Sequence, residues 1–360
     1  MEWTKPKYRR VEVDTAGRRL AQFLRGASLG DFPPDEWSKS IEIINNWRSA
    51  HAYPLNTFQA TLRGKARKID PNAIVAQRTK RLWSIWHKLD RFKTMHLSQM
   101  QDIAGVRAIL GNAAQVQELV KNYEASSLRH SRKITDYIAR PRSSGYRGVH
   151  LIWRYLSDKP GAQAFNGLQL EMQIRSSLQH TWATTVETMG TLTKQALKSS
   201  LGDDNWLRFF ALMGSVIAVK EGAPAVAETP KDPNELLAEL RKYADRVNAL
   251  NRLRTIGDAL RQLDENVGEA SQARYFLLEL TPDTIKITGF KTSEHQEAQS
   301  QYTDVEQRIT ADEASDAVLV SVDSIASLRR AYPNYFLDTS AFATLLETAL
   351  GGSLMDDASG

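Results

Sequence analysis

The feature that most constrains the fold of this chain is a pair of segments in which apolar and polar side chains alternate. Strict alternation predicts a β-strand that buries one face and exposes the other. In residues 168–175 the apolar positions are leucine, methionine and isoleucine, and the polar positions are Gln169, Glu171, Gln173 and Arg175. In residues 148–156 four apolar residues share one face, and His150 lies on the other. A solvated sheet face explains either strand alone, whereas the two together favour a binding surface.

The loop that precedes the first of these strands is rich in groups that suit a nucleotide. Arg140, Arg142 and Arg147 can bind phosphates through their guanidinium forks. Gly145 permits a ligand to approach the backbone closely, and Tyr146 offers a flat ring on which a base can stack. A half-buried turn tyrosine is the alternative interpretation of Tyr146.

Length and composition limit the classes of protein to consider. At 360 residues the chain is longer than one typical domain, so we expect two. The absence of cysteine excludes disulfides, thiolate nucleophiles and cysteine-ligated zinc sites. The net charge of +5 is compatible with an anionic partner. The first residues lack a signal-peptide core and the most apolar run, 209–219, is too short to span a bilayer, so we expect a soluble cytoplasmic protein without a membrane partner.

Two basic segments lie ahead of the alternating strands. Residues 35–68 have helical apolar spacing and end in a run that contains Lys65, Arg67 and Lys68. That run is either a solvated helix end that complements the helix dipole or a contact for nucleic-acid phosphates.

The second basic segment, residues 78–89, has the pattern of an amphipathic helix. We expect Lys80, Ser84 and Lys88 to form one stripe of this helix, opposite its apolar face. Two ammonium groups that flank a hydroxyl could bind a triphosphate. A charged outer stripe is the alternative interpretation.

Asp102 precedes a short apolar strand that contains Arg107. In a regular strand their opposite parity would place them on different faces. Either Gly105 marks a bulge that brings both to one side, or Asp102 lies just ahead of the strand. Alone, Asp102 would be interpreted as a turn or capping residue. Together with Glu171 it forms a carboxylate pair suited to Mg²⁺.

Four motifs in this order resemble the synthetase domain of the RelA/SpoT alarmone-synthetase family. They are R-x-K-x-x-x-S-x-x-x-K at 78–88, D-I-A-G-V-R at 102–107, D-Y-I-x-x-P-R-x-x-G-Y-x-x-x-H at 136–150 and E-x-Q-I-R at 171–175. Four motifs in series over roughly a third of the chain are highly specific. The chain contains neither a Walker-type phosphate loop nor a protein-kinase signature.

The resemblance implies an α+β fold in which a nucleotidyltransferase-like domain, built on a mixed β-sheet flanked by helices, precedes a smaller α+β regulatory domain. It also implies pyrophosphokinase chemistry, in which an acceptor hydroxyl attacks the β-phosphorus of ATP and AMP leaves. By this resemblance Arg78 and Arg107 sandwich the adenine, a role that suits guanidinium planes. Lys80, Ser84 and Lys88 match positions around the ATP phosphates.

The family's catalytic positions also have counterparts here. Asp102 and Glu171 match the Mg²⁺ site, and Glu171 is the expected general base for the acceptor hydroxyl. Tyr146 matches the residue on which the acceptor base stacks. The residues expected beside it are Arg142, His150, Gln173 and Arg175.

Two departures from the family pattern bear on the acceptor. Family members that use GDP or GTP commonly have a basic residue at the position of Thr135 and an asparagine at that of Ser144. The departures favour the toxic small alarmone synthetases, some of which modify the 3′-terminal adenosine of tRNA. A tRNA acceptor requires basic patches outside the pocket. Candidates for them are Lys65, Arg67, Lys68, Arg129, Arg132 and Lys133. Synthesis of (p)ppGpp from GDP or GTP is the alternative, and a catalytically idle nucleotide sensor is a third.

The C-terminal third predicts a further α+β domain. We expect a helix over 201–220, a Gly- and Pro-rich linker, a long helix over 235–263, a hairpin over 274–289 with its turn at Pro282 and Asp283, and a strand over 317–322. The predicted boundaries are therefore 1–222 for the synthetase domain, 223–234 for the linker and 235–360 for the regulatory domain.

This arrangement resembles the CapRel group of fused toxin–antitoxin proteins of anti-phage defence. The resemblance also rests on N-N-W-R-S-x-H at 45–51 and Y-x-x-Y at 332–335. It implies that the C-terminal domain holds the synthetase inactive and binds a phage protein, such as the major capsid protein, as the trigger. It further implies that Tyr332 and Tyr335 occupy the ATP pocket, whereas helix-end packing is the alternative for such a motif.

Overall fold

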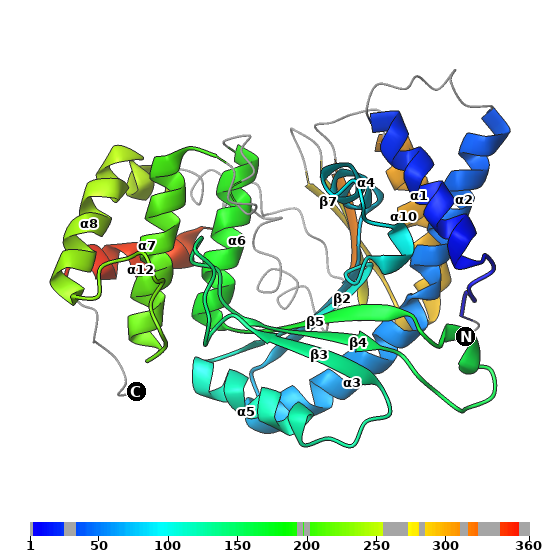
Figure 1. Ribbon diagram of the computed structural model, residues 1–360, viewed down its shortest axis with the longest axis horizontal. Helices are drawn as coiled ribbons and strands as arrows, with labels where there is room; N and C mark the ends of the chain where they lie inside the picture. The colour runs from blue at the N-terminus through cyan, green and yellow to red at the C-terminus, as the bar shows by residue number, and fades with distance from the viewer. Residues whose placement is uncertain are drawn as a thin grey trace.

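The computed structural model describes residues 3–24, 34–192, 197, 202–254, 273–280, 285–309, 316–322 and 339–352. Its centre is one eight-stranded sheet with the strand order β3-β4-β5-β2-β1-β8-β6-β7 (Figure 1). The neighbours β2 and β5 run parallel, and the other neighbouring pairs run antiparallel. The expected α+β fold with a mixed sheet flanked by helices is confirmed.

The strands and helices cover most of the described chain. The strands are β1 Ile74–Thr79, β2 Ala104–Leu110, β3 Ser131–Asp136, β4 Val149–Arg154, β5 Gln169–Ser176, β6 Tyr275–Leu280, β7 Ile285–Phe290 and β8 Asp316–Ser321. The helices are α1 Arg10–Leu24, α2 Pro34–Ala50, α3 Ala52–Ile69, α4 Leu82–Arg91, α5 Ala113–Glu124, α6 Ser177–Leu192, α7 Asp204–Lys220, α8 Pro233–Arg246, α10 His295–Ile309 and α12 Ser340–Leu350. No helix among the described residues is both long and apolar enough to cross a membrane.

The alternating segments form the two neighbouring strands β4 and β5, as predicted. Their apolar positions, including Leu151, Trp153 and Met172, are fully buried and pack with residues of α3 and α5 such as Phe58 and Leu119. Figure 1 shows α3 and α5 on this side of the sheet and α4 and α6 on the other. The polar positions therefore face the side that carries α4 and α6.

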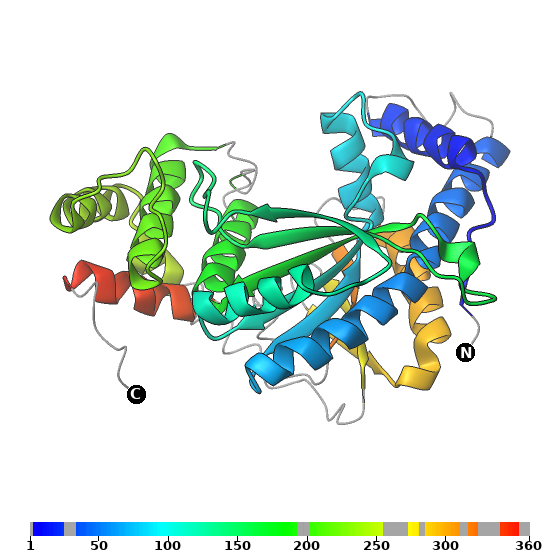
Figure 2. The ribbon, with the colours of Figure 1, turned by 60° about the horizontal axis from the view of Figure 1, so that its bottom comes forward.

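A second apolar core joins helices from both halves of the chain. It contains Trp182 of α6, Phe209 of α7, Leu240 of α8 and Phe342 of α12. The N-termini of two of these helices follow the capping rules, because Asp203 and Asp232 each accept hydrogen bonds from the first backbone N–H groups of α7 and α8. Figure 2 shows these four helices as a bundle at one end of the sheet.

The segment 35–68 is helical as predicted, and it forms two helices, α2 and α3, which meet at the buried His51. One predicted helix boundary is wrong. The helix expected over 235–263 ends at Arg246 because Asn248 adopts a left-handed conformation with a φ of 49°, which a continuous helix cannot accommodate. A short helical segment then reaches residue 254, beyond which residues 255–272 lie outside the described part.

The C-terminal strands continue the sheet begun by the N-terminal half. β8 pairs with β1 at Gln77↔Ser321 and Arg78↔Val320, and β6 and β7 extend the sheet from β8. The predicted hairpin is thus confirmed as β6 and β7, although its turn at Pro282 and Asp283 lies outside the described residues. The synthetase domain over 1–222 and the regulatory domain over 235–360 stay a prediction. Strands from both of these segments belong to one sheet.

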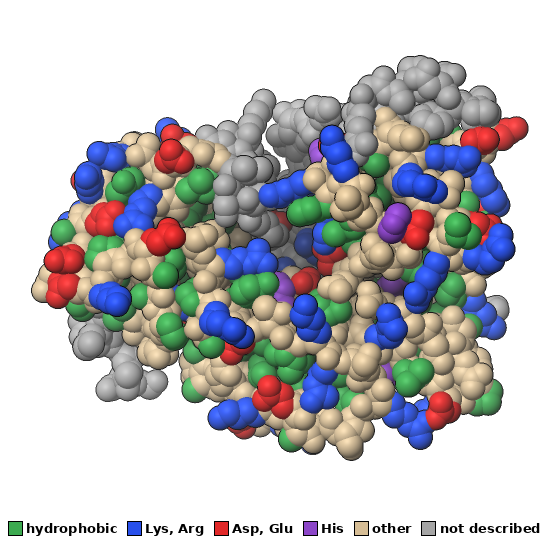
Figure 3. All heavy atoms as spheres, viewed as in Figure 1, with side chains coloured by type: hydrophobic (Ala, Val, Ile, Leu, Met, Phe, Trp, Pro, Cys, Tyr) green, Lys and Arg blue, Asp and Glu red, His purple; other side chains and the backbone are tan. Residues whose placement is uncertain are grey.

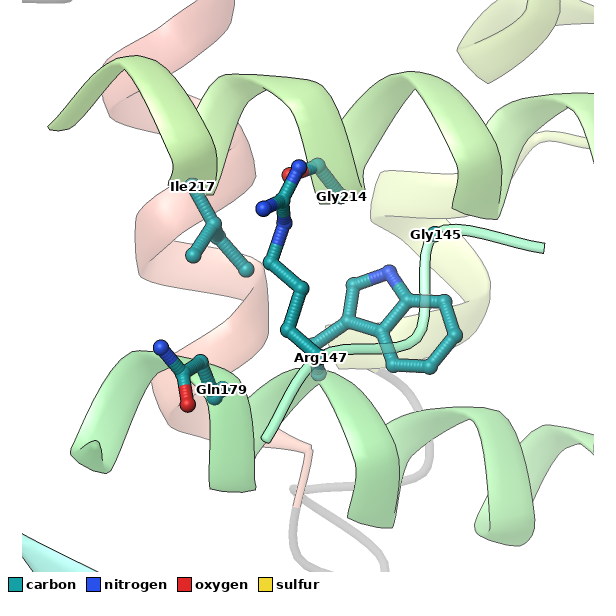
Figure 4. Close-up of a pocket in the computed structure, with 6 residues that line it drawn as sticks. Gly145, Arg147, Gln179, Gly214 and Ile217 are labelled. Atoms are coloured by element: carbon teal, nitrogen blue, oxygen red, sulfur yellow. The ribbon is translucent and has the colours of Figure 1, made fainter. Parts of the chain in front are cut away.

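The loop ahead of β4 is held against α7 by a close backbone contact. Gly145 has a φ of 93°, which favours glycine, and a Cβ at Gly214 would lie 2.7 Å from the Gly145 Cα. The side chain of Arg147 is 2% exposed and donates to the carbonyls of Gly214 (3.1 Å), Ile138 (3.3 Å) and Pro224 (2.5 Å). Figure 4 shows Arg147 between Gln179 of α6 and Gly214 of α7.

These contacts correct two expectations. Arg147 does not bind phosphate from this position, because its guanidinium donates to three backbone carbonyls. Gly145 is required for the approach of the chain's own helix α7, rather than for the approach of a ligand.

We predict that Gly214→Ala lowers the free energy of unfolding by about 1–3 kcal/mol, because the new methyl group must displace the backbone of Gly145. The matched control is Gly64→Ala in α3, where a Cβ would meet nothing within 4 Å. The control is expected to raise the free energy of unfolding by about 0.5–1 kcal/mol through helix propensity. Chemical denaturation of both variants measures the difference, and equal stabilisation of the two would contradict the contact.

Candidate active site

The strand register brings the predicted site residues of the sheet to one face. Residues directly opposite one another on neighbouring strands point to the same side. His150 and Arg107 both lie opposite Gln173, and Gly105 lies opposite Glu171. Arg78 lies opposite Gly105 on the next strand. The strands therefore present Arg78, Arg107, His150, Glu171 and Gln173 on the side away from α3 and α5.

Asp102 lies just ahead of β2, so it can face the same side as Arg107 although their positions differ in parity. β2 pairs without interruption with β1 and β5 from Gly105 onward, so Gly105 is not a bulge. Asp102 is thereby free of the alternation of the strand. Its carboxylate is 24% exposed and faces the same side as Glu171.

Two lysines bind opposite oxygens of the Asp102 carboxylate. Nζ of Lys80 lies 2.8 Å from Oδ2, and Nζ of Lys88 lies 2.8 Å from Oδ1. The expectation that both lysines belong to one helical stripe is wrong for Lys80, which precedes α4. The apolar face predicted for this helix is confirmed, since Leu82, Ile85, Trp86 and Leu89 are buried. The tertiary structure, rather than helix periodicity, brings the two ammonium groups together.

The charges around Asp102 favour an added anion. Burial raises the pKa of Asp102, but the ammonium groups of Lys80 and Lys88 outweigh it and lower the pKa to about 2. Burial lowers the pKa of Lys80, and the nearby Lys88 and Arg78 act in the same direction, so Asp102 only partly compensates. One carboxylate thus faces several cations, and a polyphosphate would stabilise their charged forms.

Glu171 and four neighbouring side chains form a closed ring of hydrogen bonds. Nδ1 of His150 lies 2.8 Å from Oε1 of Glu171, and Nε2 of the same imidazole bonds the Tyr146 hydroxyl. Arg175 donates to the Tyr146 hydroxyl (2.8 Å) and to Oε1 of Gln173 (3.0 Å). The Gln173 amide donates to Oε2 of Glu171 (2.8 Å), which closes the ring.

The ring sets the acidity of Glu171. Burial raises the pKa of Glu171, but the hydrogen bond and charge of His150 outweigh it, with a smaller contribution from Gln173, and the pKa falls to about 2. The negative charge of Asp102 acts in the opposite direction. Asp102 is bonded to Lys88 of α4, which lies on the side of the sheet that Glu171 faces, so both carboxylates belong to one face.

The carboxylate pair fits a magnesium ion that is shared with a phosphate. Within the described residues there is no group of three or more His, Cys, Asp or Glu side chains that could enclose a metal. Mg²⁺ commonly binds through one or two carboxylates together with substrate phosphates. Asp102 and Glu171 supply two such carboxylates, 24% and 16% exposed, beside the two lysines.

The predicted acceptor residues cluster around Tyr146, which is half-buried. The guanidinium of Arg175 lies 5.1 Å from the centre of the Tyr146 ring and that of Arg142 lies 5.9 Å from it. Arg142 also donates to the hydroxyl of Tyr137 (2.8 Å). The Tyr137 ring stands edge-on to both Tyr146 and His150. Tyr137 lies within the motif at 136–150, but its spacing alone assigned it no role.

The remaining predicted donor residues flank the carboxylates. Arg78 and Arg107 are half-buried on β1 and β2, and Ser84 is half-buried on the first turn of α4. Figure 3 shows a hollow at the middle of this face, with basic and acidic side chains around it. Tyr332 and Tyr335 lie outside the described residues.

The structure does not bring the six candidate tRNA-binding residues into one patch. Lys65 bonds Asn122 and Ser126 at the end of α5. Arg132 donates to the Glu124 carbonyl (2.7 Å) and lies opposite Trp153, on the side of α3 and α5.

The other four of these residues lie on three different segments. Arg67 and Lys68 belong to the last turn of α3, near Lys65. Arg129 pairs with Asp158. Lys133 lies opposite Ile152 on β4, on the same face as Glu171.

The segment that holds this site is similar to known proteins. Residues 77–190 match the family described as the region found in RelA / SpoT proteins. The GTP pyrophosphokinases of Haemophilus influenzae and Escherichia coli are 26% and 25% identical over 153 residues, which cover 41% of this chain. The chain spans 18% of the length of these relatives.

Solved structures with similar chains include small alarmone synthetase 1 from Bacillus subtilis bound to its product pppGpp. It is 21% identical, with a TM-score of 0.41, and the match covers 48% of this chain and 89% of that one. Asp102, Tyr146 and Glu171 all fall within residues 77–190. The candidate site therefore lies in the part of the chain that is related to the RelA/SpoT family.

Proposed function

We propose that the protein is a pyrophosphokinase that transfers pyrophosphate from ATP to the 3′-hydroxyl of the tRNA acceptor end and releases AMP. In this proposal it is a toxin of anti-phage defence that blocks translation. Residues 235–360 hold it inactive until a phage protein, such as the major capsid protein, binds. The observation that carries the chemistry is that Asp102, which is bonded by Lys80 and Lys88, and Glu171 lie on one face of the sheet.

On the donor side, the cations bind and orient the triphosphate. Lys80 and Lys88 exchange part of their interaction with Asp102 for the phosphate oxygens. The hydroxyl of Ser84, which lies on α4 with Lys88, donates to the same phosphates. Arg78 and Arg107 stack on the adenine from two neighbouring strands. Mg²⁺, held by Asp102 and Glu171, supplies charge neutralisation at the phosphates when it is bound.

On the acceptor side, Glu171 removes the proton from the attacking hydroxyl. The hydrogen bond from His150 is the strongest of the influences that lower the pKa of this carboxylate. An acceptor that breaks this bond therefore raises the pKa of Glu171 and makes it a stronger base. The hydroxyl oxygen then attacks the β-phosphorus, the bond to the α-phosphate oxygen breaks, and AMP leaves with that oxygen.

The acceptor is argued from the face that surrounds Tyr146. Thr135 lies directly opposite His150 and so faces the site, where a neutral side chain provides no charge for the 5′ phosphates of a guanine nucleotide. A terminal nucleoside needs a stacked base and a free hydroxyl. Lys133 lies two residues away on the same face and is the predicted tRNA contact nearest to this pocket.

The second candidate is synthesis of (p)ppGpp from GDP or GTP. It is favoured by the relatives named GTP pyrophosphokinase and by the B. subtilis synthetase bound to pppGpp. The third is a catalytically idle sensor that binds nucleotide in the same pocket.

We predict that Glu171→Gln and Asp102→Asn each reduce pyrophosphate transfer at least ~10²-fold, because each removes a charge from the carboxylate pair and the first also removes the base. The matched control is Glu118→Gln, an exposed carboxylate of α5 on the other side of the sheet. All three variants are made in the Tyr335→Ala background, release of AMP from ATP is measured, and thermal unfolding confirms the fold. Full activity in either site variant would refute the assignment.

The acceptor is identified by incubating the full-length Tyr335→Ala variant, which lacks the proposed inhibitory side chain, with ATP labelled at its β and γ phosphates, in the presence of tRNA and, separately, of GDP or GTP. The full chain is used because β6, β7 and β8 complete the sheet. We expect the label in the 3′-terminal adenosine of tRNA. Label in a guanine nucleotide would establish the second candidate, and bound but untransferred ATP would establish the third.

We predict that Tyr335→Ala makes the full chain toxic on expression in bacteria without any phage protein, because it removes the proposed competitor for the adenine pocket. Tyr243→Ala on α8 serves as the control tyrosine. Cell growth and incorporation of label into tRNA are measured. A harmless, well-expressed Tyr335→Ala protein would exclude the autoinhibitory role of this residue.

A further inference from the structure

A buried ion pair joins α10, near the end of the chain, to α2, near its start. Arg48 is 1% exposed and Glu306 is 7% exposed. Nη1 of Arg48 lies 2.6 Å from Oε2 of Glu306, and Nη2 lies 3.1 Å from Oε1. The Tyr302 hydroxyl bonds both partners, at 2.7 Å from Glu306 and 2.9 Å from Arg48. This fork-to-fork geometry fixes both side chains.

Both members of the pair also bind the backbone of the donor-site segment. Oε1 of Glu306 accepts from the N–H of Leu82, the first residue of α4, at 3.0 Å. Nε of Arg48 donates to the carbonyl of Lys80 at 3.0 Å. A carboxylate at a helix N-terminus satisfies an N–H group that has no partner within the helix and interacts favourably with the helix dipole.

These contacts fix the turn that links β1 to α4. Lys80 precedes this turn and Lys88 follows it within α4, and their ammonium groups bind opposite oxygens of Asp102. The angle at which α4 leaves the sheet therefore sets the distance between the two ammonium groups. Glu306 and Arg48 determine that angle, because they bind the backbone on either side of the turn.

We infer that Glu306 is a positioning residue for the donor site, and that α10 is a required part of the ATP-binding machinery. The inference rests on the proposed function, since it concerns how the triphosphate cations are arranged. Glu306 acts on the N–H of Leu82 directly and on the carbonyl of Lys80 through Arg48. It does not touch the nucleotide. The same C-terminal segment that is proposed to inhibit the enzyme thus also supports its donor site.

A purely structural role for the ion pair makes a different prediction. Replacing a buried ion pair by apolar residues of similar size is commonly neutral for stability, whereas removing one partner is costly. The double variant Arg48→Met/Glu306→Leu can therefore keep the fold while it loses the contacts to Leu82 and Lys80. If the pair served stability alone, a stable double variant would bind ATP normally.

The experiment measures binding of a non-hydrolysable ATP analogue with Mg²⁺ by calorimetry, and backbone amide exchange of residues 80–91. Both are measured on the full chain, and again with Tyr335→Ala to remove the proposed plug. The variants are Glu306→Gln, which keeps one acceptor oxygen, and Arg48→Met/Glu306→Leu. The matched control is Glu239→Gln, which disturbs the bidentate pair of Arg208 and Glu239 between α7 and α8.

In the Tyr335→Ala background, we expect the double variant to bind the analogue at least ~10-fold more weakly than the chain with Arg48 and Glu306 intact, at similar thermal stability and with faster amide exchange at the start of α4. Glu306→Gln should lie between the two, and Glu239→Gln should match the unaltered chain. Normal binding by a stable double variant would overturn the inference.

The outcomes separate this inference from the proposed function. If the unaltered chain and its Tyr335→Ala form both fail to bind the analogue, the proposed function fails, and amide exchange alone still decides whether Glu306 fixes α4. If they bind it and the double variant binds it equally well, the proposed function stands and the positioning role fails.

Discussion

The parallel pairing of β2 with β5 is the constraint on which the site depends. This register puts Gly105 opposite Glu171 and Arg107 opposite Gln173. It therefore carries Asp102, just ahead of β2, to the side on which Glu171 lies. A shift of one residue would turn Glu171 and Gln173 into the apolar core, and would expose Leu170 and Met172 in their place. Burial of the apolar positions against α3 and α5 thus determines which side chains lie on the polar face, because only this register buries them.

Electrostatics gives this face its chemical character. Each carboxylate is stabilised in its ionised form by a different kind of partner, Asp102 by two ammonium groups and Glu171 by an imidazole and an amide. The first environment is rich in positive charge and suits phosphates. The second is a closed hydrogen-bonded ring that also contains the guanidinium of Arg175. The two acidic groups of this face therefore have different electrostatic environments.

The C-terminal segment is integrated into the structure at three places. β8 extends the sheet beside β1, Glu306 of α10 binds the start of α4, and α12 packs into the core shared by α6 and α7. The linker also contributes, because the Pro224 carbonyl accepts from Arg147 in the loop that carries Tyr146. Residues beyond 222 therefore make direct contacts with the start of α4 and with the loop that carries Tyr146.

The sequence by itself determined the local features of this protein. Alternation predicted β4, β5 and the separation of Glu171 and Gln173 from the apolar core, because side-chain direction in a strand follows from parity alone. The resemblance to the RelA/SpoT synthetases, carried by four motifs, implied which residues would gather on one face. Asp102 could be assigned to either of two arrangements, because a strand boundary is not encoded by alternation.

Only the tertiary structure decided which of the basic residues share a site. It brings the ammonium groups of Lys80 and Lys88 to one carboxylate, although the two residues lie on either side of a turn. The guanidinium of Arg147 binds backbone carbonyls instead of a phosphate. Arg132 and Lys133 point to opposite faces of the sheet. The tertiary structure also pairs Arg48 with Glu306. Contacts between residues 258 positions apart have no periodic signature in the sequence, because they depend on how separate elements pack once the sheet has formed.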